Sequence, residues 1–381
     1  MGEITRQIIC FFVIILLSFG HGVKGRRTSL GNKNAVKIIH SEGDIIDCVD
    51  IYKQPAFDHP LLKNHTIQMG PSWYPNEASN EPKISSKERV VSSRVWNKFE
   101  ECPEGTIPIY RSQRNDNVVP EFVRAFGEKS TEGIPFPKKE KYGDQNAEYA
   151  GMYVKDKYFY GASQRCGVWN PQLEVQTEYS AAATWLVNNV GSETNVVGAG
   201  WIVKPSLFGD NRTRLFVSWN KVAGSQFTGC YNLFCPGFIQ TTSEVVLGGF
   251  LTPISVIGGK LHELRYNIVK DPNTGHWWYS VQDIPVGYWP ASMFVNLQVA
   301  LTVPGGLHTA TQMGNGIFPE EKQSAATFYD LQVRDGGGKW DSVTDLNNFK
   351  DSRYCYDSMV MSLFIRDAFH FGGPGRGSSC M

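Results

Sequence analysis

The sequence predicts an all-β protein, with an antiparallel β-sandwich in its C-terminal part and a polar, propeptide-like segment before it. Short runs of alternating apolar and polar residues recur through the second half of the chain, separated by clusters of glycine, asparagine and aspartate. Such runs at this spacing are typical of antiparallel sandwiches. Aromatic residues make up 13% of the chain and charged residues 19%, a composition opposite to that of a disordered chain.

The strand predictions rest on alternation. The stretches predicted as strands are Arg214–Trp219, Val245–Leu247, Lys260–Val269, Trp277–Val281 and Thr327–Val333. In the third of these, Leu264, Tyr266 and Ile268 share one face, as a period of two requires. Turn clusters at 209–211, 271–275 and 335–338 separate the strands. Long helical periodicity is absent, and only 359–369 is expected to form a short helix.

An apolar run at residues 8–19 predicts a secretory signal peptide. It has about a dozen residues, fewer than the roughly 20 that span a bilayer. Arg6 precedes the run, and Gly20 and Gly22 supply the small residues that a signal peptidase prefers, so we expect residues 1–22 to be removed. The alternative is an uncleaved signal anchor. We expect the mature protein to be soluble and exported, without a stable membrane anchor.

The charge distribution divides the remaining chain. Lys plus Arg and Asp plus Glu both number 37, so no basic excess exists for binding nucleic acid. Residues 1–147 hold 38 charged side chains (20 basic, 18 acidic), whereas residues 148–381 hold only 36. The stretch 132–144 is rich in proline, glycine and charge, like an exposed and cleavable connection. We therefore expect a polar segment at 23–145 and a dense domain at 146–381.

Familiar catalytic and ligand-binding motifs are missing. The chain has no G-x-S-x-G elbow, no H-E-x-x-H helix and no glycine-rich phosphate loop after a strand. The eight histidines are scattered singly and have no metal-ligand spacing. We expect no metal site and no cofactor.

The cysteines suggest a disulfide framework. The expected pairs are Cys230–Cys235, Cys355–Cys380 and Cys48–Cys102. The first pair favours a small disulfide loop, because a metal site would need two more ligands nearby. Cys166 is left over: it is either buried and inert, paired with another chain or, least expected, catalytic. In an exported chain, Asn64 and Asn211 are expected glycosylation sites, because each begins an Asn-x-Thr sequon.

Several long motifs resemble the neprosin family of secreted plant proteins. In the N-terminal segment they are Gly43–Asn64 and Cys102–Ile109, which resemble the family's activation peptide, so that 23–145 corresponds to this peptide and 146–381 to the neprosin domain. In the domain they are Gly200–Val203, Gly209–Phe216, Thr228–Cys235, Gly287–Pro290, Thr311–Gly314 and Gly372–Gly375. The resemblance implies a β-sandwich glutamic endopeptidase that cuts after proline, is made as a zymogen and is activated by acid.

The family mechanism requires two glutamates, one ionised to activate water and one protonated to polarise the carbonyl. By the resemblance, the first belongs in the motif that reads Val197-Gly198-Ala199-Gly200-Trp201 here, and Gly198 takes its place. The second belongs in a Trp-Gly-Gly-Glu motif, and Leu307 takes its place in a shortened segment. Neither residue can transfer a proton, so both catalytic carboxylates are expected to be absent.

Three residues are candidate substitutes for the missing acids. Glu193 lies five residues before Gly198, which puts it on the opposite face of a strand. Glu178 is expected to be structural, because its surroundings are usual for the family. His308 would serve as a base only if the shortened loop moved it into place.

Retained aromatic motifs predict a peptide-binding cleft. The candidate residues are Trp201, Tyr288, Trp289 and Gln312. An aromatic surface with few charges suits a proline-rich peptide or extracellular protein; the alternative is that these aromatic residues belong to the core. The sequence therefore predicts a secreted, catalytically degenerate relative in the cell wall, the apoplast or another secretory compartment. The alternative is an active, proline-directed acid endopeptidase made as a zymogen.

Overall fold

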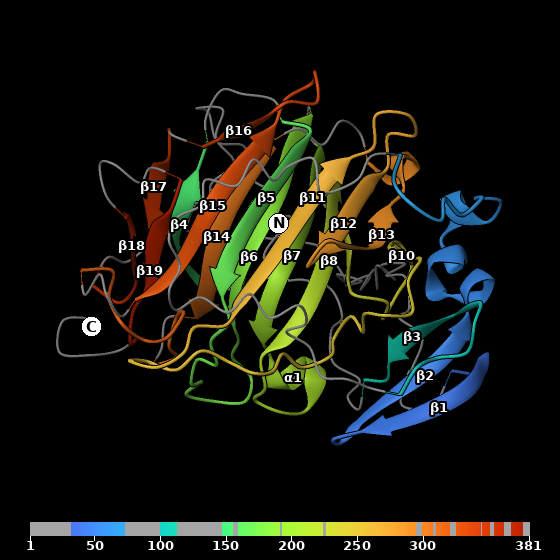
Figure 1. The fold of residues 1–381 in the computed structure, drawn as a ribbon, viewed down its shortest axis with the longest axis horizontal. Helices are drawn as coiled ribbons and strands as arrows, with labels where there is room; N and C mark the ends of the chain where they lie inside the picture. The colour runs from blue at the N-terminus through green and yellow to red at the C-terminus, as the bar shows by residue number, and fades with distance from the viewer. Residues whose placement is uncertain are drawn as a thin grey trace, which may run out of the picture.

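A computed structural model describes the fold over residues 32–72, 100–112, 147–154, 159–190, 193–223, 226–294, 299–307, 310–320, 325–343, 345–350, 354–361 and 367–375. The expected signal peptide and the stretch 132–144 lie outside these residues. Strands of three antiparallel sheets form nearly all of the regular secondary structure in the described residues, which confirms the all-β prediction. Figure 1 shows two large sheets lying over one another and a small sheet, β1 to β3, beside one end of them.

The seven-stranded sheet has the order β17-β4-β14-β6-β7-β8-β9. In that order its strands span Asn347–Lys350, Ala147–Tyr153, Val299–Leu307, Ser180–Val190, Glu193–Val203, Arg214–Ala223 and Gln226–Tyr231. Its centre is buried on both faces: every residue of β7 after Glu193 is buried. A strand covered on both sides reads as a continuous apolar run rather than as an alternating one.

The nine-stranded sheet has the order β10-β13-β12-β11-β5-β15-β19-β18, with β16 paired to β15. In that order its strands span Ile239–Gln240, Ile284–Trp289, Trp277–Val281, Glu263–Lys270, Gly161–Gly167, Ala326–Arg334, Phe369–Gly372 and Asp357–Val360, and β16 spans Trp340–Ser342. The prediction of Trp277–Val281 matches β12, and three other predicted strands overlap β8, β11 and β15.

Two predictions of local structure were wrong. Val245–Leu247 is buried but pairs with no strand, and the side chain of Gln240 donates to the Val245 carbonyl at 2.7 Å. The described residues of the expected helix at 359–369 lie largely in a hairpin, because Met359 and Val360 of β18 pair with His370 and Phe369 of β19.

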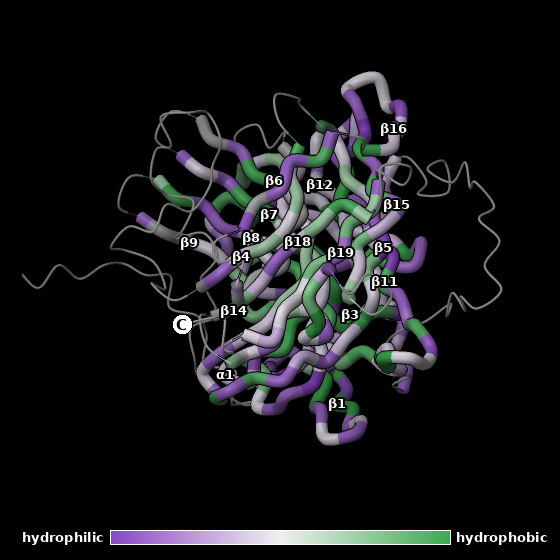
Figure 2. Tube along the Cα trace, turned by 90° about the vertical axis from the view of Figure 1, so that its left-hand side faces the viewer, coloured by the Kyte–Doolittle hydropathy of each residue, from purple (hydrophilic) through white to green (hydrophobic). Residues whose placement is uncertain are grey.

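The two large sheets pack through their inner faces. Trp201 on β7 donates its indole N–H to the Gly167 carbonyl of β5 at 2.9 Å. Thr184 on β6 lies 3.5 Å from the hydroxyl of Tyr266 on β11. Figure 2 shows the hydrophobic residues along the central strands and hydrophilic residues at the rim, for instance beside β16. The core therefore lies between the sheets, as in a β-sandwich.

The N-terminal segment forms its own sheet with the order β1-β2-β3. These strands span Ala35–Ser41, Asp44–Asp50 and Thr106–Tyr110, and the short helical turns η1, η2 and η3 follow β2 at Ile51–Lys53, Pro55–Asp58 and Pro60–Leu62. The small sheet lies beside α1 (Pro205–Phe208), because the Tyr110 hydroxyl donates to the Phe208 carbonyl at 3.1 Å and the Ser112 hydroxyl to the Leu207 carbonyl at 3.0 Å. A last turn, η6, spans Ala291–Met293.

Candidate functional site

Gly198 lies in the middle of β7, between Trp185 of β6 and Ser218 of β8. A Cβ atom at this position would lie 2.0 Å from Cε3 of Trp185 and 2.4 Å from its Cζ3. The indole ring therefore lies directly over the glycine, in space that a larger side chain would need. Trp185 is 4% exposed and packs against Phe216 with ring centroids 5.9 Å apart. The surroundings of Gly198 are aromatic and apolar.

Leu307 ends β14, and the sheet register keeps its backbone far from Gly198. Trp185 pairs with Gly198 on one side and with Leu301 on the other, so Leu301 is level with Gly198. Leu307 lies six residues further along β14, which corresponds to about 20 Å along the strand. The structure therefore does not bring the two expected glutamate positions together. Two carboxylates that share a proton must lie close enough to interact directly.

Few acidic residues lie in the seven-stranded sheet. Its strands contain only Glu148, near the start of β4, and Glu193, at the start of β7. Glu148 pairs with Gly306, Gly306 with Ser180 and Ser180 with Val203, so Glu148 and Val203 lie at the same height in the sheet. Glu193 lies ten residues before Val203 on β7. The two acids are therefore about 30 Å apart along the strand direction. Glu193 also forms an ion pair with Lys221 at 3.1 Å.

The three aromatic residues expected in a cleft are fully buried: Trp201, Tyr288 and Trp289 each have 0% exposure. Trp201 lies between the sheets, where it bonds to Gly167. Trp289 packs edge-on against Phe238 at 5.0 Å. Neither lines an open surface in this structure, because each fills core space as the alternative interpretation describes.

The retained Thr-Gln-Met-Gly motif joins two loops. The backbone N–H of Gln312 donates to the Gln172 carbonyl at 2.8 Å, and the Gln312 side chain accepts from the Gln172 N–H at 3.1 Å. Thr311 donates its hydroxyl to the buried Glu178 carboxylate and accepts from the Glu174 N–H. Gln312 and Glu178 therefore contribute to loop structure. His308 lies outside the described residues.

The N-terminal segment contacts the domain through a buried ion network. Arg214, at the start of β8, has 0% exposure, and Asp44 of β2 has 4%. Arg214 donates to both Asp44 oxygens at 2.9 Å and to Asp210 at 2.6 Å. Arg212 donates to Asp44 at 2.8 Å and to Asp210 at 2.6 Å. Hydrogen bonds from Arg214 and Arg212 outweigh the effect of burial and lower the pKa of Asp210.

A second contact covers Tyr288 on β13. The Tyr288 hydroxyl lies 2.8 Å from Nε2 of His65 and accepts from the Gln68 N–H at 3.0 Å. The His276 ring stacks on Tyr288 with centroids 4.7 Å apart. Burial, then the nearby charge of His65, lowers the pKa of His276 to about 4. Burial also raises the pKa of Tyr288 to about 12. His65 and Gln68 of the N-terminal segment therefore both contact the hydroxyl group of Tyr288.

Asp271, after β11, holds the end of the same stretch. It accepts from the Ser72 backbone and hydroxyl at 2.7 and 2.6 Å, and from the Gln68 amide at 2.8 Å. Burial opposes ionisation of Asp271, but the hydrogen bonds from Ser72 and Gln68 outweigh it and lower its pKa to about 2. Asp271 is therefore an acceptor for the backbone of the bound segment.

A third contact closes a sheet edge. The Gln54 side chain donates to the Gln240 carbonyl at 3.1 Å and accepts from the Gln240 N–H at 2.9 Å. Gln240 lies on β10, the last strand of the nine-stranded sheet. One amide side chain therefore stands in for a neighbouring strand.

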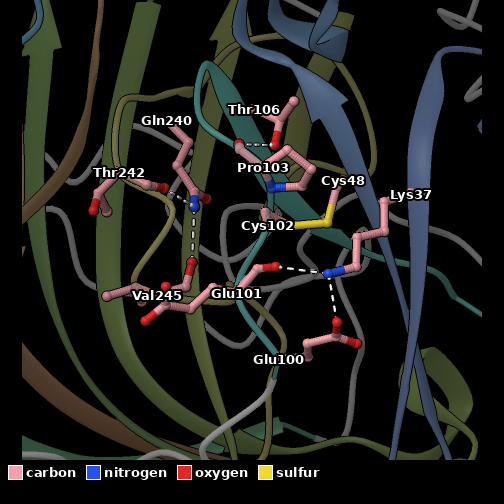
Figure 3. The surroundings of a disulfide bond; sticks show 10 residues. All are labelled: Lys37, Cys48, Glu100, Glu101, Cys102, Pro103, Thr106, Gln240, Thr242 and Val245. Atoms are coloured by element: carbon pink, nitrogen blue, oxygen red, sulfur yellow. Dashed lines mark hydrogen bonds and ion pairs between the residues drawn. A yellow bond between two sulfur atoms is a disulfide. The ribbon is translucent and has the colours of Figure 1, made fainter.

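Two of the expected disulfides form. Cys48 is joined to Cys102, and Cys230 to Cys235. Figure 3 shows the first of these beside Lys37, which donates to the Glu100 carboxylate at 2.7 Å and to the Glu101 carbonyl at 3.0 Å. Cys355 is disulfide-bonded, and its expected partner Cys380 lies outside the described residues.

Cys166 is a free thiol and fully buried. Burial raises its pKa, followed in effect by the nearby charge of Glu263. A protonated and inaccessible thiol is inert, which matches the first of the three interpretations of Cys166.

Both sequon asparagines, Asn64 and Asn211, are exposed. Within the described part of the chain, no group of three His, Cys, Asp or Glu side chains is arranged to hold a metal ion. The same residues include no helix of sufficient length and apolar character to cross a bilayer.

The residues that attach the N-terminal segment were not singled out from the sequence. Asp44 lies in the Gly43–Asn64 motif and Arg214 in the Gly209–Phe216 motif, 170 residues apart. A charged residue that begins an apolar strand is the only local signal of Arg214. His276 and Asp271 lie in a turn cluster, where polar residues are ordinary.

Two solved peptidases resemble the fold at low sequence identity. Scytalido-glutamic peptidase with a peptide-based transition state analog matches at 11% identity and a TM-score of 0.35, covering 60% of this chain and 98% of the peptidase. SCP-B, a member of the eqolisin family of peptidases, in complex with the tripeptide Ala-Ile-His, matches at 9% identity and a TM-score of 0.32, with the same coverage of the two chains.

Family models cover most of the sequence. The neprosin activation peptide matches residues 37–153 and neprosin matches residues 176–374, which is more than half of the chain. The first match includes β1 to β3 with Asp44, Gln54, His65 and Gln68, and the second includes the domain residues that they contact. The chain belongs to the neprosin family, with the activation peptide ahead of the neprosin domain.

Proposed function

We propose that this neprosin-family chain is an exported protein without carboxylate-pair catalysis, and that it binds proline-containing peptides. The sheet register is the observation that supports the loss of catalysis. Glu148 and Glu193 are the only acids in the seven strands, and they lie about 30 Å apart along the strand direction. A glutamic peptidase needs one ionised and one protonated carboxyl around the same water and carbonyl. Gly198 and Leu307 supply neither group.

Peptide binding is supported by what already lies on Tyr288. The stretch from His65 to Ser72 includes Pro71 and has no regular secondary structure. Two of its backbone N–H groups bond to the domain, with Gln68 donating to Tyr288 and Ser72 to Asp271. The side chains of His65, Gln68 and Ser72 add further contacts to the same two residues. Contacts to backbone groups tolerate different side chains, and proline-containing chains lose little conformational entropy on binding to aromatic surfaces. A peptide supplied in trans would use the same acceptors once this stretch has left.

The protein is expected to act outside the cell, in the cell wall, the apoplast or another secretory compartment. Its disulfides are consistent with an oxidising compartment. The exposed Asn64 and Asn211 then carry glycans, which intact-mass measurement before and after deglycosylation would detect.

A second function, acid endopeptidase activity, is favoured by the family and by one pair of buried acids. Glu148 is level with Ser180 through Gly306, and Glu178 lies two residues before Ser180. Both carboxyl side chains are buried, at 2% and 3% exposure. This is the end of the sheet at which Leu307 lies.

A hydrolysis assay separates the two functions. The secreted protein is incubated with quenched fluorescent peptides, with and without proline, from pH 2 to pH 7. The parent, Glu148→Gln and Glu178→Gln are compared with Glu193→Gln as a control at an exposed ion pair. We expect no turnover by any form. Proline-dependent turnover that Glu148→Gln or Glu178→Gln abolishes, while Glu193→Gln retains it, would establish the endopeptidase instead.

A further inference from the structure

The guanidinium group of Arg214 is bound on two sides by different parts of the chain. Toward the N-terminal segment, Nη1 and Nη2 each donate to one oxygen of Asp44 at 2.9 Å. Two parallel bonds of this kind match the geometry of a carboxylate. Toward the domain, Nη1 donates to the Gly248 carbonyl at 2.7 Å and Nη2 to Asp210 at 2.6 Å. If the segment left, Arg214 would lose Asp44 and the Tyr110 ring beneath its guanidinium group but would keep Gly248 and Asp210.

Arg212 completes the same carboxylate contact. Its Nη2 donates to Asp44 at 2.8 Å and its Nε to Asp210 at 2.6 Å. Its guanidinium lies over the Phe250 ring, 4.2 Å from the centroid. The ring contact and the Asp210 contact hold the plane of the guanidinium in place, so Arg212 and Arg214 remain aimed at one position.

The charges of this cluster balance only while Asp44 is present. Arg212 and Arg214 contribute two positive charges, whereas Asp44 and Asp210 contribute two negative charges. Without the Asp44 carboxylate, but with the rest of the segment in place, the cluster has one positive charge in excess at a site where Arg214 is fully buried. An uncompensated buried charge is strongly unfavourable, so an anion is favoured in place of Asp44. If the segment left, Asp210 would still hold both guanidinium groups beside the same position. Planar, paired donors match two oxygens of one anionic group, as the two bonds to the Asp44 carboxylate show.

We propose that Arg212 and Arg214 form a carboxylate-binding site of the neprosin domain, which Asp44 fills within the chain and the acidic side chain of a peptide ligand fills after the segment leaves. The site lies away from Tyr288 and adds a requirement to the proposed peptide binding, namely an acidic residue in the ligand. It rests on the proposed function only in that the ligand is a peptide.

The existence of the site is tested in the full chain with Asp44→Ala. This substitution removes the carboxylate and leaves a small gap facing both arginines. Acetate should raise the melting temperature of the variant by several degrees in a saturable manner, whereas chloride at equal ionic strength should not. Asp58→Ala, at an exposed acid in the same segment, should not respond to acetate. Failure of acetate to stabilise Asp44→Ala more than Asp58→Ala would overturn the site.

The source of the carboxylate is tested in trans. A protease site placed within 132–144 of the Asp44→Ala chain allows its segment to be cut from the domain, with both pieces kept in solution. A labelled peptide copying residues 42–50 should then bind at least tenfold more tightly than the same peptide with Asn in place of Asp44. Arg212→Gln should reduce that ratio. Equal affinities of the two peptides would overturn the proposal that the ligand is a peptide. The same conclusion would follow if acetate half-saturated the site at a concentration no higher than the peptide requires.

These tests are independent of the hydrolysis assay. Turnover by the parent chain would contradict the proposed loss of catalysis and leave the acetate result unchanged. Conversely, the absence of an acetate effect would remove the carboxylate site and leave peptide binding at Tyr288 to be judged separately.

Discussion

On one face of strand β8, an apolar region and a charged region lie only four residues apart. Ser218 is level with Gly198, where catalysis is expected in this family, and its surroundings are the rings of Trp185 and Phe216. Arg214 points from the same face and joins a four-residue ion network with the activation peptide. Charged side chains lie where the activation peptide is attached, whereas the surroundings of Gly198 are aromatic and apolar. The buried charge on this part of β8 therefore holds the N-terminal segment.

The largest expected effect tests the attachment side of this comparison. Arg214→Met should lower the free energy of unfolding by about 3–5 kcal/mol, because the buried Asp44 would lose its main cation and the partly exposed Asp210 one of its two arginines. Denaturant unfolding at neutral pH measures the change. Lys221→Met, on the same strand at an ion pair that is about one third exposed, should cost less than about 1 kcal/mol. Equal losses in the two variants would mean that the network contributes no more than a surface pair.

The next effect tests the apolar side. Gly198→Ala should lower the free energy of unfolding by about 1–3 kcal/mol, because the added methyl would overlap the Trp185 ring. In a Trp185→Ala background the same change should cost much less, which a double-mutant cycle would report as coupling. Additive losses would show that the ring does not occupy the space beside Gly198. Gly198→Glu should not restore hydrolysis, since a single carboxylate forms no pair.

The sequence predicted several strands from short apolar runs and failed where contacts with other segments decide the structure. Trp277–Val281, a short aromatic run, forms β12 as predicted. Val245–Leu247 is equally apolar, but Gln240 takes up the Val245 carbonyl and no strand pairs with the run. The sequence around Met359 predicts a helix, but Met359 pairs with His370 in a strand. Local periodicity contains no information about which strand will be a neighbour.

The candidate site shows the same limit. The sequence alone indicated that carboxylates are missing at Gly198 and Leu307, but it did not indicate their separation, which depends on the register of β6 with both neighbours. Asp44 and Arg214 each lie in a motif that the sequence singled out, yet their pairing spans 170 residues. Tyr288 was predicted as a cleft residue and is buried, and nothing in the sequence indicated the segment at His65 and Gln68 that contacts it.

A third prediction uses pH to separate the two attachment contacts. The pKa of His276 is lowered to about 4, so the docked state binds fewer protons than the released state between about pH 6.5 and pH 4. Docking of residues 65–72 should therefore be fully stable above pH 6.5 and weaken as the pH falls through this window. Loss of the Asp271 contribution follows only as the pH falls from 3.8 through about 2.

Hydrogen exchange measures this pH effect. Protection of the Gln68 and Ser72 amides should fall roughly tenfold between pH 7 and pH 4, after allowance for the partial exposure of His276. His276→Phe keeps the stacking on Tyr288 and should remove most of the pH dependence. Amides of β2 beside Asp44 should keep their protection over the same range, because the hydrogen-bond partners of that network in the described part of the chain include no imidazole. A parallel loss at both contacts would show that the segment leaves as one unit.

The smallest expected effect lies at the third contact, where no charge is involved. Gln54→Leu leaves the Gln240 N–H and carbonyl at the edge of β10 without their partner, and should cost about 1–2 kcal/mol of stability. Gln176→Leu removes an exposed hydrogen bond to Asn211 and should cost almost nothing. If Gln54→Leu destabilised the chain as much as Arg214→Met, neutral hydrogen bonds would attach the segment as firmly as the ion network does. The difference between the charged region at Arg214 and the apolar region at Gly198 would then show where charge lies, but it would not explain how firmly the segment is attached.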